Sequence, residues 1–312
     1  MSRTESTAAD STFQDSPPRV VPTEEEIAEA AALPLSSRFT LGARITGVQQ
    51  AFLDRHGFLV FEQVASPEEV ASILAEVDAV QAAWLAEGRE SINGIPLVVG
   101  EDEAGAPFIQ RFAFTSVYSE YIRDFVRDRR FMPVRGLVGA RTRVGDTERD
   151  GVVFNRNMTL PGSAYSRLGW HTDGLRDLFI PHGTWPWFRV PGPQLNVGMH
   201  FDHITAADGG LRLVPGSHNQ GFFSMMFNKP YFISHRADPR GIAVETRPGD
   251  LTVHDGRTWH RVERSPHVGR RSLRRTMYVP YLEDEPKPKT EESSTPFYHS
   301  LGRYLNRYVR TG

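Results

Sequence analysis

The residues of this sequence best suited to hold a metal ion lie in two tryptophan–histidine steps. The first step belongs to the stretch GWHTDG at positions 169–174, and the second is Trp259-His260. Side chains alternate along a β-strand, so His171 and Asp173 point to the same face if they lie on one strand. The distant His260 then completes the set. Two imidazoles and one carboxylate on one face of an octahedron leave three positions open, as in non-heme Fe(II) sites.

Spacing alone does not single out this triplet, because the chain has eleven histidines and His200 and Asp202 repeat the H-x-D pattern. Context separates the two triplets. His171 lies in a polar segment flanked by glycine, where a strand can open onto a pocket, and His260 follows a strand-like run. We therefore predict that His171, Asp173 and His260 bind the metal. Zinc stays open as an alternative to iron, since it accepts the same ligand types.

The motifs around these residues follow the order of a known family. They are FLDRHGFLV at 52–60, HTD at 171–173, GGLRLVPGSH at 209–218, PGDL at 248–251 and WH at 259–260. Over residues 45–282 the chain resembles the phytanoyl-CoA dioxygenase family of Fe(II)- and 2-oxoglutarate-dependent oxygenases. Each motif is weak support by itself, and the ordered combination is specific.

The resemblance implies Fe(II) as the metal, with 2-oxoglutarate and O2 as cosubstrates, and no catalytic residue beyond the metal centre. The implied reaction oxidises an unactivated C–H bond of a small molecule, most simply by hydroxylation, and releases succinate and CO2. Desaturation, ring closure and epimerisation stay open. Because Asp173 occupies the carboxylate position, halogenation is not expected, since the related halogenases have a small residue there.

The family also has an arginine past the distal histidine, whose guanidinium matches a carboxylate of 2-oxoglutarate in bidentate geometry. Three arginines fall in range: Arg271, Arg274 and Arg275. Arg274 is preferred, because on a strand it shares a face with Thr276. The Thr276 hydroxyl can replace the one that many relatives carry at the position of Val262. Arg271 and Arg275 stay open as alternatives.

Other side chains near the motifs have two interpretations each. Four arginines near the motifs could face an anionic substrate. Charged residues on a barrel rim are more often simply solvated, and that role is preferred. The four are Arg156, Arg176, Arg189 and Arg212. His254 either supports the metal ligands or is a core residue, and the second role is preferred.

Composition limits the class of protein. The 312 residues are 39% hydrophobic, with a net charge of −2. Near-neutral charge with scattered basic residues argues against a nucleic-acid partner, and no apolar run approaches the ~20 residues of a membrane helix. There is no cysteine and no apolar leader at the start, so we expect a cytoplasmic protein. The expected partner is a small-molecule substrate, and the expected state is a monomer or homodimer.

The pattern of elements indicates a mainly β protein. From about residue 151 onward, short strand-like runs alternate with glycine and proline. This texture predicts a double-stranded β-helix, the jelly-roll core of cupin-like proteins, over residues 151–282. Helical periodicity predicts flanking α-helices at 24–32 and 67–87. The segment 179–193, with two tryptophans and four prolines, is expected to form a lid.

The expected domain organisation is simple. A disordered tail covers residues 1–22, because this stretch is rich in Ser, Thr, Asp and Pro. One oxygenase domain covers residues 23–282. A linker and a C-terminal helix follow at 283–312, where a polar run with prolines precedes an apolar stripe at helical spacing.

Two other classes of function stay open. A cupin-like protein that binds a metal or small molecule without catalysis would keep the barrel, although three ligands and an arginine are more than binding requires. A zinc hydrolase would need a general base beside the triad, and none is obvious. Formation of succinate from 2-oxoglutarate separates the oxygenase from both.

Overall fold

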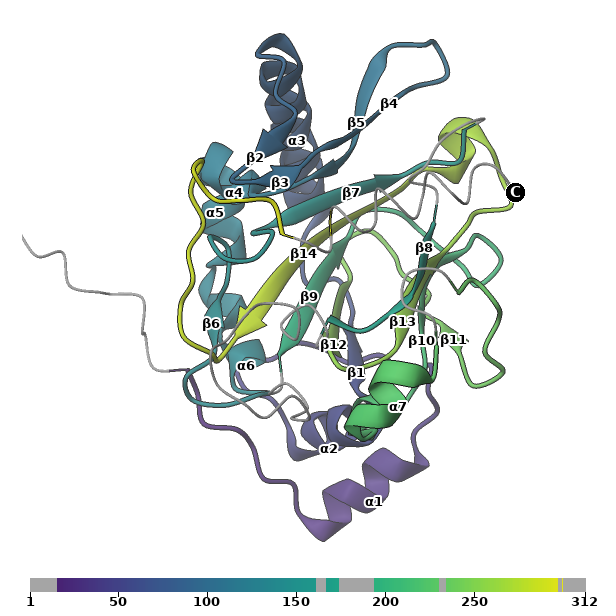
Figure 1. The fold of residues 1–312 in the computed structure, drawn as a ribbon. Helices are drawn as coiled ribbons and strands as arrows, with labels where there is room; N and C mark the ends of the chain where they lie inside the picture. The colour runs from purple at the N-terminus through teal and green to yellow at the C-terminus, as the bar shows by residue number, and fades with distance from the viewer. Residues whose placement is uncertain (1–15, 161–166, 174–193, 230–233, 297–298, 300–312) are drawn as a thin grey trace, which may run out of the picture.

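The core of the chain is two antiparallel sheets, and helices lie around it on several sides (Figure 1). The computed structural model describes residues 16–160, 167–173, 194–229, 234–296 and 299. Within these residues, eight strands form the larger sheet, in the order β1, β12, β9, β14, β7, β5 and β4, with β6 beside β14. Four strands form the smaller sheet, in the order β11, β10, β13 and β8. The predicted jelly-roll core with flanking helices is confirmed.

The strands of the larger sheet come from most of the chain. They are β1 (Phe58–Phe61), β4 (Val98–Glu101), β5 (Pro107–Phe112), β6 (Arg143–Val144), β7 (Val153–Asn157), β9 (Leu195–His200), β12 (Leu251–Asp255) and β14 (Arg274–Leu282). Four of these strands precede residue 151. The sheet therefore begins earlier in the chain than the strand-like texture of the sequence indicated, because β1 pairs with β12 and β5 pairs with β7.

The smaller sheet lies on the other side of the site. Its strands are β8 (Leu168–His171), β10 (Gly210–Leu213), β11 (Ile242–Ala243) and β13 (His260–Glu263). A separate hairpin joins β2 (Ser91–Ile92) to β3 (Ile95–Pro96). All strands of the smaller sheet are short. Residues of β8, β10 and β13 line the cavity that the two sheets enclose.

The three longest helices each begin at a residue whose side chain caps the helix. In the described residues the helices are α1 (Glu24–Ala32), α2 (Gly47–His56), α3 (Pro67–Ala86), α4 (Thr115–Tyr118), α5 (Glu120–Val126), α6 (Met132–Arg135) and α7 (Phe222–Phe227), with short 3-10 turns at 129–131, 217–219 and 269–272. Thr23, Thr46 and Ser66 each form a capping box at the start of α1, α2 and α3, which satisfies free N–H groups. The two predicted helices are confirmed.

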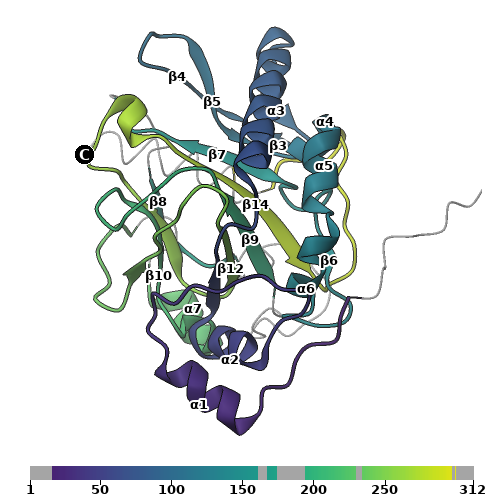
Figure 2. The ribbon, with the colours of Figure 1, turned by 180° about the vertical axis from the view of Figure 1, so that it is seen from behind.

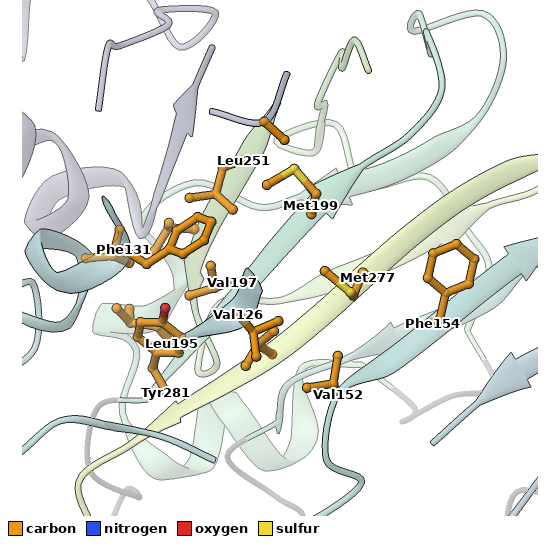
Figure 3. Packing of buried hydrophobic residues seen from close by; sticks show 14 of the residues in the cluster. Val126, Phe131, Val152, Phe154, Leu195, Val197, Met199, Leu251, Met277 and Tyr281 are labelled. Atoms are coloured by element: carbon orange, nitrogen blue, oxygen red, sulfur yellow. The ribbon is translucent and has the colours of Figure 1, made fainter. Parts of the chain in front are cut away.

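The larger sheet has an apolar face and a polar face. Helices α3 and α5 lie on one side of it, away from β8 and β13 (Figure 2). Figure 3 shows Val126 and Phe131 of this helical layer beside Val197 and Met277 of the sheet. Because alternate residues of a strand face opposite ways, this packing fixes which side chains of β9 and β14 turn toward the smaller sheet.

The segment after β14 lies against the domain and does not extend away from it. Pro288 bridges to Glu148, and the backbone N–H of Lys289 donates to the carbonyl of Thr147 at 2.8 Å. Of the predicted tail at 1–22, residues 1–15 lie outside the described residues, as do the whole of the predicted lid at 179–193 and nearly all of the predicted C-terminal helix. No helix in the described ranges is long and apolar enough to cross a membrane.

Candidate metal centre

The three predicted metal ligands meet where the short strands of the smaller sheet end. His171 closes β8 and His260 opens β13, and the two residues are direct partners in the antiparallel register. One ligand atom from each of His171, Asp173 and His260 lies within 4.8 Å of the others. The Nε2 of His260 is 3.6 Å from Oδ2 of Asp173, and all three residues are buried. The structure therefore brings together the residues that the H-x-D spacing predicted.

Backbone contacts hold these ligands in place. The N–H of Asp173 donates to the carbonyl of Gly256 at 2.7 Å, which ties the end of β8 to the loop ahead of β13. The N–H of Trp259 donates to Oγ of Ser217 at 2.8 Å, and this hydroxyl donates to the carbonyl of Val214 at 2.7 Å. The PGSH turn at 215–218 therefore has a structural role, because it fixes the residue before His260.

The orientation of both imidazoles prepares one nitrogen of each ring for a metal. Nδ1 of His171 lies 2.8 Å from the carbonyl of Gly169, and Nδ1 of His260 lies 2.9 Å from the carbonyl of Thr258. A carbonyl oxygen only accepts, so each Nδ1 must carry the hydrogen. In a neutral ring this leaves the Nε2 lone pair available, which is the arrangement of metal-binding histidines. Two such nitrogens and a carboxylate oxygen suit Fe(II).

A second layer of polar side chains supports the carboxylate ligand. The amide Nδ2 of Asn196 donates to Oδ2 of Asp173 and lies 3.3 Å from Nε2 of His254. The His254 ring is 4.7 Å from the His260 ring, centroid to centroid. Burial keeps the pKa of His254 well below its usual range, with a smaller contribution from His260. A neutral His254 accepts from the amide, so the amide is held with its N–H groups toward Asp173.

We expect Asn196→Leu to weaken metal binding by roughly 10- to 100-fold, the usual cost of losing such a supporting contact. The leucine removes the donor that orients Asp173 and keeps a similar volume. The measurement is Co(II) affinity from the visible absorption of the bound ion. Asn219→Leu is the matched control, because Asn219 donates to the backbone of Asp54 on another surface. Equal Co(II) affinity in the two variants would contradict the role of Asn196 in orienting Asp173.

The triad opens onto a cavity of about 140 Å³ between the two sheets. Arg274, Thr276, Tyr278 and Pro280 of β14 line it, as alternation along the strand requires. Met277, Val279 and Tyr281 of β14 face the other way and pack against the helical layer. The opposite wall is apolar and includes Leu211, Val244 and Val262. One cavity therefore contains the candidate metal ligands, an arginine and a hydroxyl.

The three candidate arginines have different surroundings. Arg274 is buried in the cavity wall, where its Nη1 donates to the carbonyl of Glu263, and burial lowers its pKa to about 10. It is still a cation at neutral pH. Arg275 points the other way and forms a salt bridge with Asp202 at 2.6 Å. Arg271 is exposed. Of the three, only Arg274 faces the triad.

Comparison with known proteins agrees with this geometry. The family model described as phytanoyl-CoA dioxygenase matches residues 53–272. The chain belongs to the phytanoyl-CoA dioxygenase family. Two curated relatives are ectoine dioxygenases of Bordetella parapertussis, 30% identical over 182 residues, and Bordetella bronchiseptica, 29% identical over 182 residues. In each case the match covers 57% of this chain, and the chain spans about half the length of the relative, 50%.

Solved structures share the fold of this phytanoyl-CoA dioxygenase family member. The non-heme alpha ketoglutarate dependent carbocyclase SnoK from nogalamycin biosynthesis has a TM-score of 0.54 at 20% identity, covering 80% of this chain and 89% of that chain. HygX from Streptomyces hygroscopicus, solved with nickel and 2-oxoglutarate bound, has a TM-score of 0.52 at 20% identity, covering 76% of this chain and 87% of that chain. Iron and 2-oxoglutarate are the cofactors of the family, and the donor set here fits them.

Other predictions for the site have mixed outcomes in this family member. His200 lines the same cavity, but Asp202 turns away to Arg275, so the second H-x-D triplet does not form a ligand cluster. Arg156 binds Asp78 on the opposite face of the sheet and Arg212 binds Glu263, and neither lines the cavity of the triad. Arg176 and Arg189 lie outside the described residues.

Sequence reasoning missed several polar residues of the cavity. They are Arg111, Arg149, Asp150, Asn155, Asn157 and Asn196. The alternation of β9 and β7 could have placed the asparagines on one face, but nothing in the sequence shows which strands pair. His254, for which a core role was preferred, lies against His260 and Asn196 and therefore supports the centre.

Proposed function

We propose that this protein is an Fe(II)- and 2-oxoglutarate-dependent dioxygenase that oxidises a C–H bond of a small molecule. The observation that carries the proposal is the joint placement of His171, Asp173 and His260 around one point and of Arg274 on the same cavity wall. A three-ligand site leaves positions open for a chelating cosubstrate and for O2. The arginine gives that cosubstrate its second anchor.

Each residue has a defined task in this proposal. His171, Asp173 and His260 hold the metal through two neutral imidazoles and one carboxylate. Arg274 binds the far carboxylate of 2-oxoglutarate with its guanidinium, and Thr276, the next inward residue of β14, donates its hydroxyl to the same group. When bound, the metal would allow one O2 to be divided between 2-oxoglutarate, which gives succinate and CO2, and the substrate C–H bond, while the iron stays on its three ligands as Fe(II). Hydroxylation of the C–H bond balances this reaction most simply.

The apolar wall of the smaller sheet strengthens the ion pair between Arg274 and the carboxylate of 2-oxoglutarate. Leu211, Val244 and Val262 line the cavity together with Arg274, which is itself buried. A charge pair gains strength where water is excluded, because the local dielectric is lower. Many relatives have a hydroxyl-bearing residue at the position of Val262, and valine has no hydroxyl. On β14 the hydroxyl nearest to Arg274 in sequence is that of Thr276.

Anaerobic addition of Fe(II) and 2-oxoglutarate to metal-free protein should produce a visible charge-transfer band, because the cosubstrate chelates the bound iron. Admission of O2 should then form succinate, slowly without substrate and faster with one. Ectoine, named in the curated relatives, is the first compound to add. A binding protein without catalysis would form no succinate, whether or not it gave the band. Tight zinc binding without the band would favour a hydrolase and contradict the dioxygenase.

A further inference from the structure

The cavity extends sideways beyond the metal ligands and Arg274. Across the larger sheet, Thr276 of β14 lies opposite Asn155 of β7, and Asn155 lies opposite Arg111 of β5. All three residues line the cavity. The cavity therefore has an arm along the polar face of the sheet that ends at Arg111, two strands away from the strand that carries Arg274.

The end of this arm is a buried ion pair with one unused donor. Nη2 of Arg111 donates to Oδ2 of Asp150 at 2.6 Å, and the two side chains are only 10% and 2% exposed. Nη1 of Arg111 is buried and has no hydrogen-bond partner among the described residues. Leaving a charged donor unpaired in a buried place costs free energy. An acceptor bound in the arm would remove this cost.

A strained turn builds the wall beside Arg111. The N–H of Gly151 donates to the carbonyl of Glu148 at 2.7 Å, and Arg149 between them has a φ of 56°. This left-handed conformation is uncommon for a residue with a side chain, and such strain concentrates at ligand sites. A Cβ on Gly151 would lie 2.3 Å from the Phe114 ring, so only glycine fits. The turn places Arg149 and Asp150 in the cavity wall.

The charges of the cavity favour an anion. Among the described residues that line it, three guanidinium groups, those of Arg111, Arg149 and Arg274, stand against two carboxylates, those of Asp150 and Asp173. A divalent metal and dianionic 2-oxoglutarate cancel each other. One positive charge therefore remains on the lining after both have bound, and because Arg149 also pairs with Asp284 behind the cavity at 3.6 Å, Arg111 is the group that offers it to a ligand. A cleft of one sign attracts ligands of the opposite sign, most strongly where water is excluded.

We propose that Arg111 binds a carboxylate of the substrate, so that the substrates of this enzyme are small carboxylic acids. Nη1 of Arg111 donates to the substrate carboxylate while Nη2 stays on Asp150, which holds the guanidinium in position. The anchor lies across two strands from Arg274, so substrate and 2-oxoglutarate occupy different parts of the cavity. The identification of the ligand as substrate rests on the proposed dioxygenase function, whereas the anion site itself does not.

A matched pair of fluorinated probes tests this site directly. The probes are 3,3,3-trifluoropropionate and its primary amide, which differ in charge and share their shape. Fluorine NMR line broadening measures their affinities for the full chain loaded with Zn(II) and saturating 2-oxoglutarate, so that Arg274 is already occupied. Loading with Mn(II) then reports, through paramagnetic broadening, whether the probe lies near the metal. We expect the acid to bind at least about tenfold more tightly than the amide.

The variants assign that preference to Arg111. Arg111→Gln should remove the preference for the acid, and Arg111→Gln combined with Asp150→Asn should do the same without leaving a buried unpaired carboxylate. Arg275→Gln, whose arginine binds Asp202 outside the cavity, should keep it. Equal binding of acid and amide, no binding of the acid, or binding that survives loss of Arg111 would overturn the proposal.

The same experiment separates this proposal from the proposed function. If metal and 2-oxoglutarate fail to bind, the dioxygenase function fails. The acid-to-amide ratio can still be measured on metal-free protein, and its dependence on Arg111 decides the anion site independently.

Discussion

His171→Ala is expected to abolish succinate formation and to lower metal affinity by more than about 100-fold, since even the loss of a supporting contact costs 10- to 100-fold. The alanine removes one of the two Nε2 lone pairs, and the remaining two ligands cannot define a three-coordinate face. The His171 ring donates to the carbonyl of Gly169, only two residues away in the chain, so its loss should leave the sheets intact. Co(II) titration, the iron charge-transfer band and succinate release measure the effect.

His200→Ala is the matched control for metal binding. His200 lies in the same cavity and in an H-x-D triplet, but its Nε2 is 2.9 Å from the hydroxyl of Thr252. Burial lowers its pKa to about 4, so the ring is neutral at working pH and its removal takes away no charge. We expect its Co(II) affinity to stay within about twofold of wild type, as expected for a residue that is not a ligand. If His171→Ala bound metal as tightly as His200→Ala, the ligand assignment would be wrong.

The two triplets show how far spacing can predict a site. A period of two places His171 with Asp173 and His200 with Asp202 equally well. What distinguishes them is tertiary: Asp173 is tied to Gly256 beside β13, whereas Asp202 is drawn away by Arg275. The glycines and polar residues around the first triplet indicated the one that the structure places beside a second histidine. They could not have shown the register that sets His171 opposite His260.

Residues contributed by neighbouring strands could not be predicted, because they depend on the order of strands in the sheet. Asn196 supports Asp173 only because β9 lies between β12 and β14. Arg111 enters the cavity only because β5, a strand from before residue 151, pairs with β7. The early part of the sequence has few strand-like runs, since helices separate its strands. The jelly roll could be predicted from the strands after residue 151. The arm of the cavity that ends at Arg111 could not.

Arg274→Gln is expected to raise the KM for 2-oxoglutarate by roughly 30- to 1,000-fold, which corresponds to about 2–4 kcal/mol for a buried charge pair that loses one partner. Glutamine can hydrogen-bond to the far carboxylate but cannot neutralise it. Maximal rates at saturating 2-oxoglutarate should fall much less, because Arg274 holds the cosubstrate at a distance from the reacting C–H bond. Succinate release against 2-oxoglutarate concentration separates the two effects, and Arg274→Lys should restore part of the affinity.

The two neighbouring arginines provide matched controls for Arg274→Gln. Arg271→Gln removes an exposed charge, and Arg275→Gln removes the partner of Asp202 on the opposite face of β14. Both should leave the KM for 2-oxoglutarate nearly unchanged, even if Arg275→Gln lowers the melting temperature. A larger KM effect in either variant than in Arg274→Gln would mean that the cosubstrate does not lie along the inward face of β14. Because the three positions lie within five consecutive residues, only strand alternation and burial can explain a difference confined to Arg274.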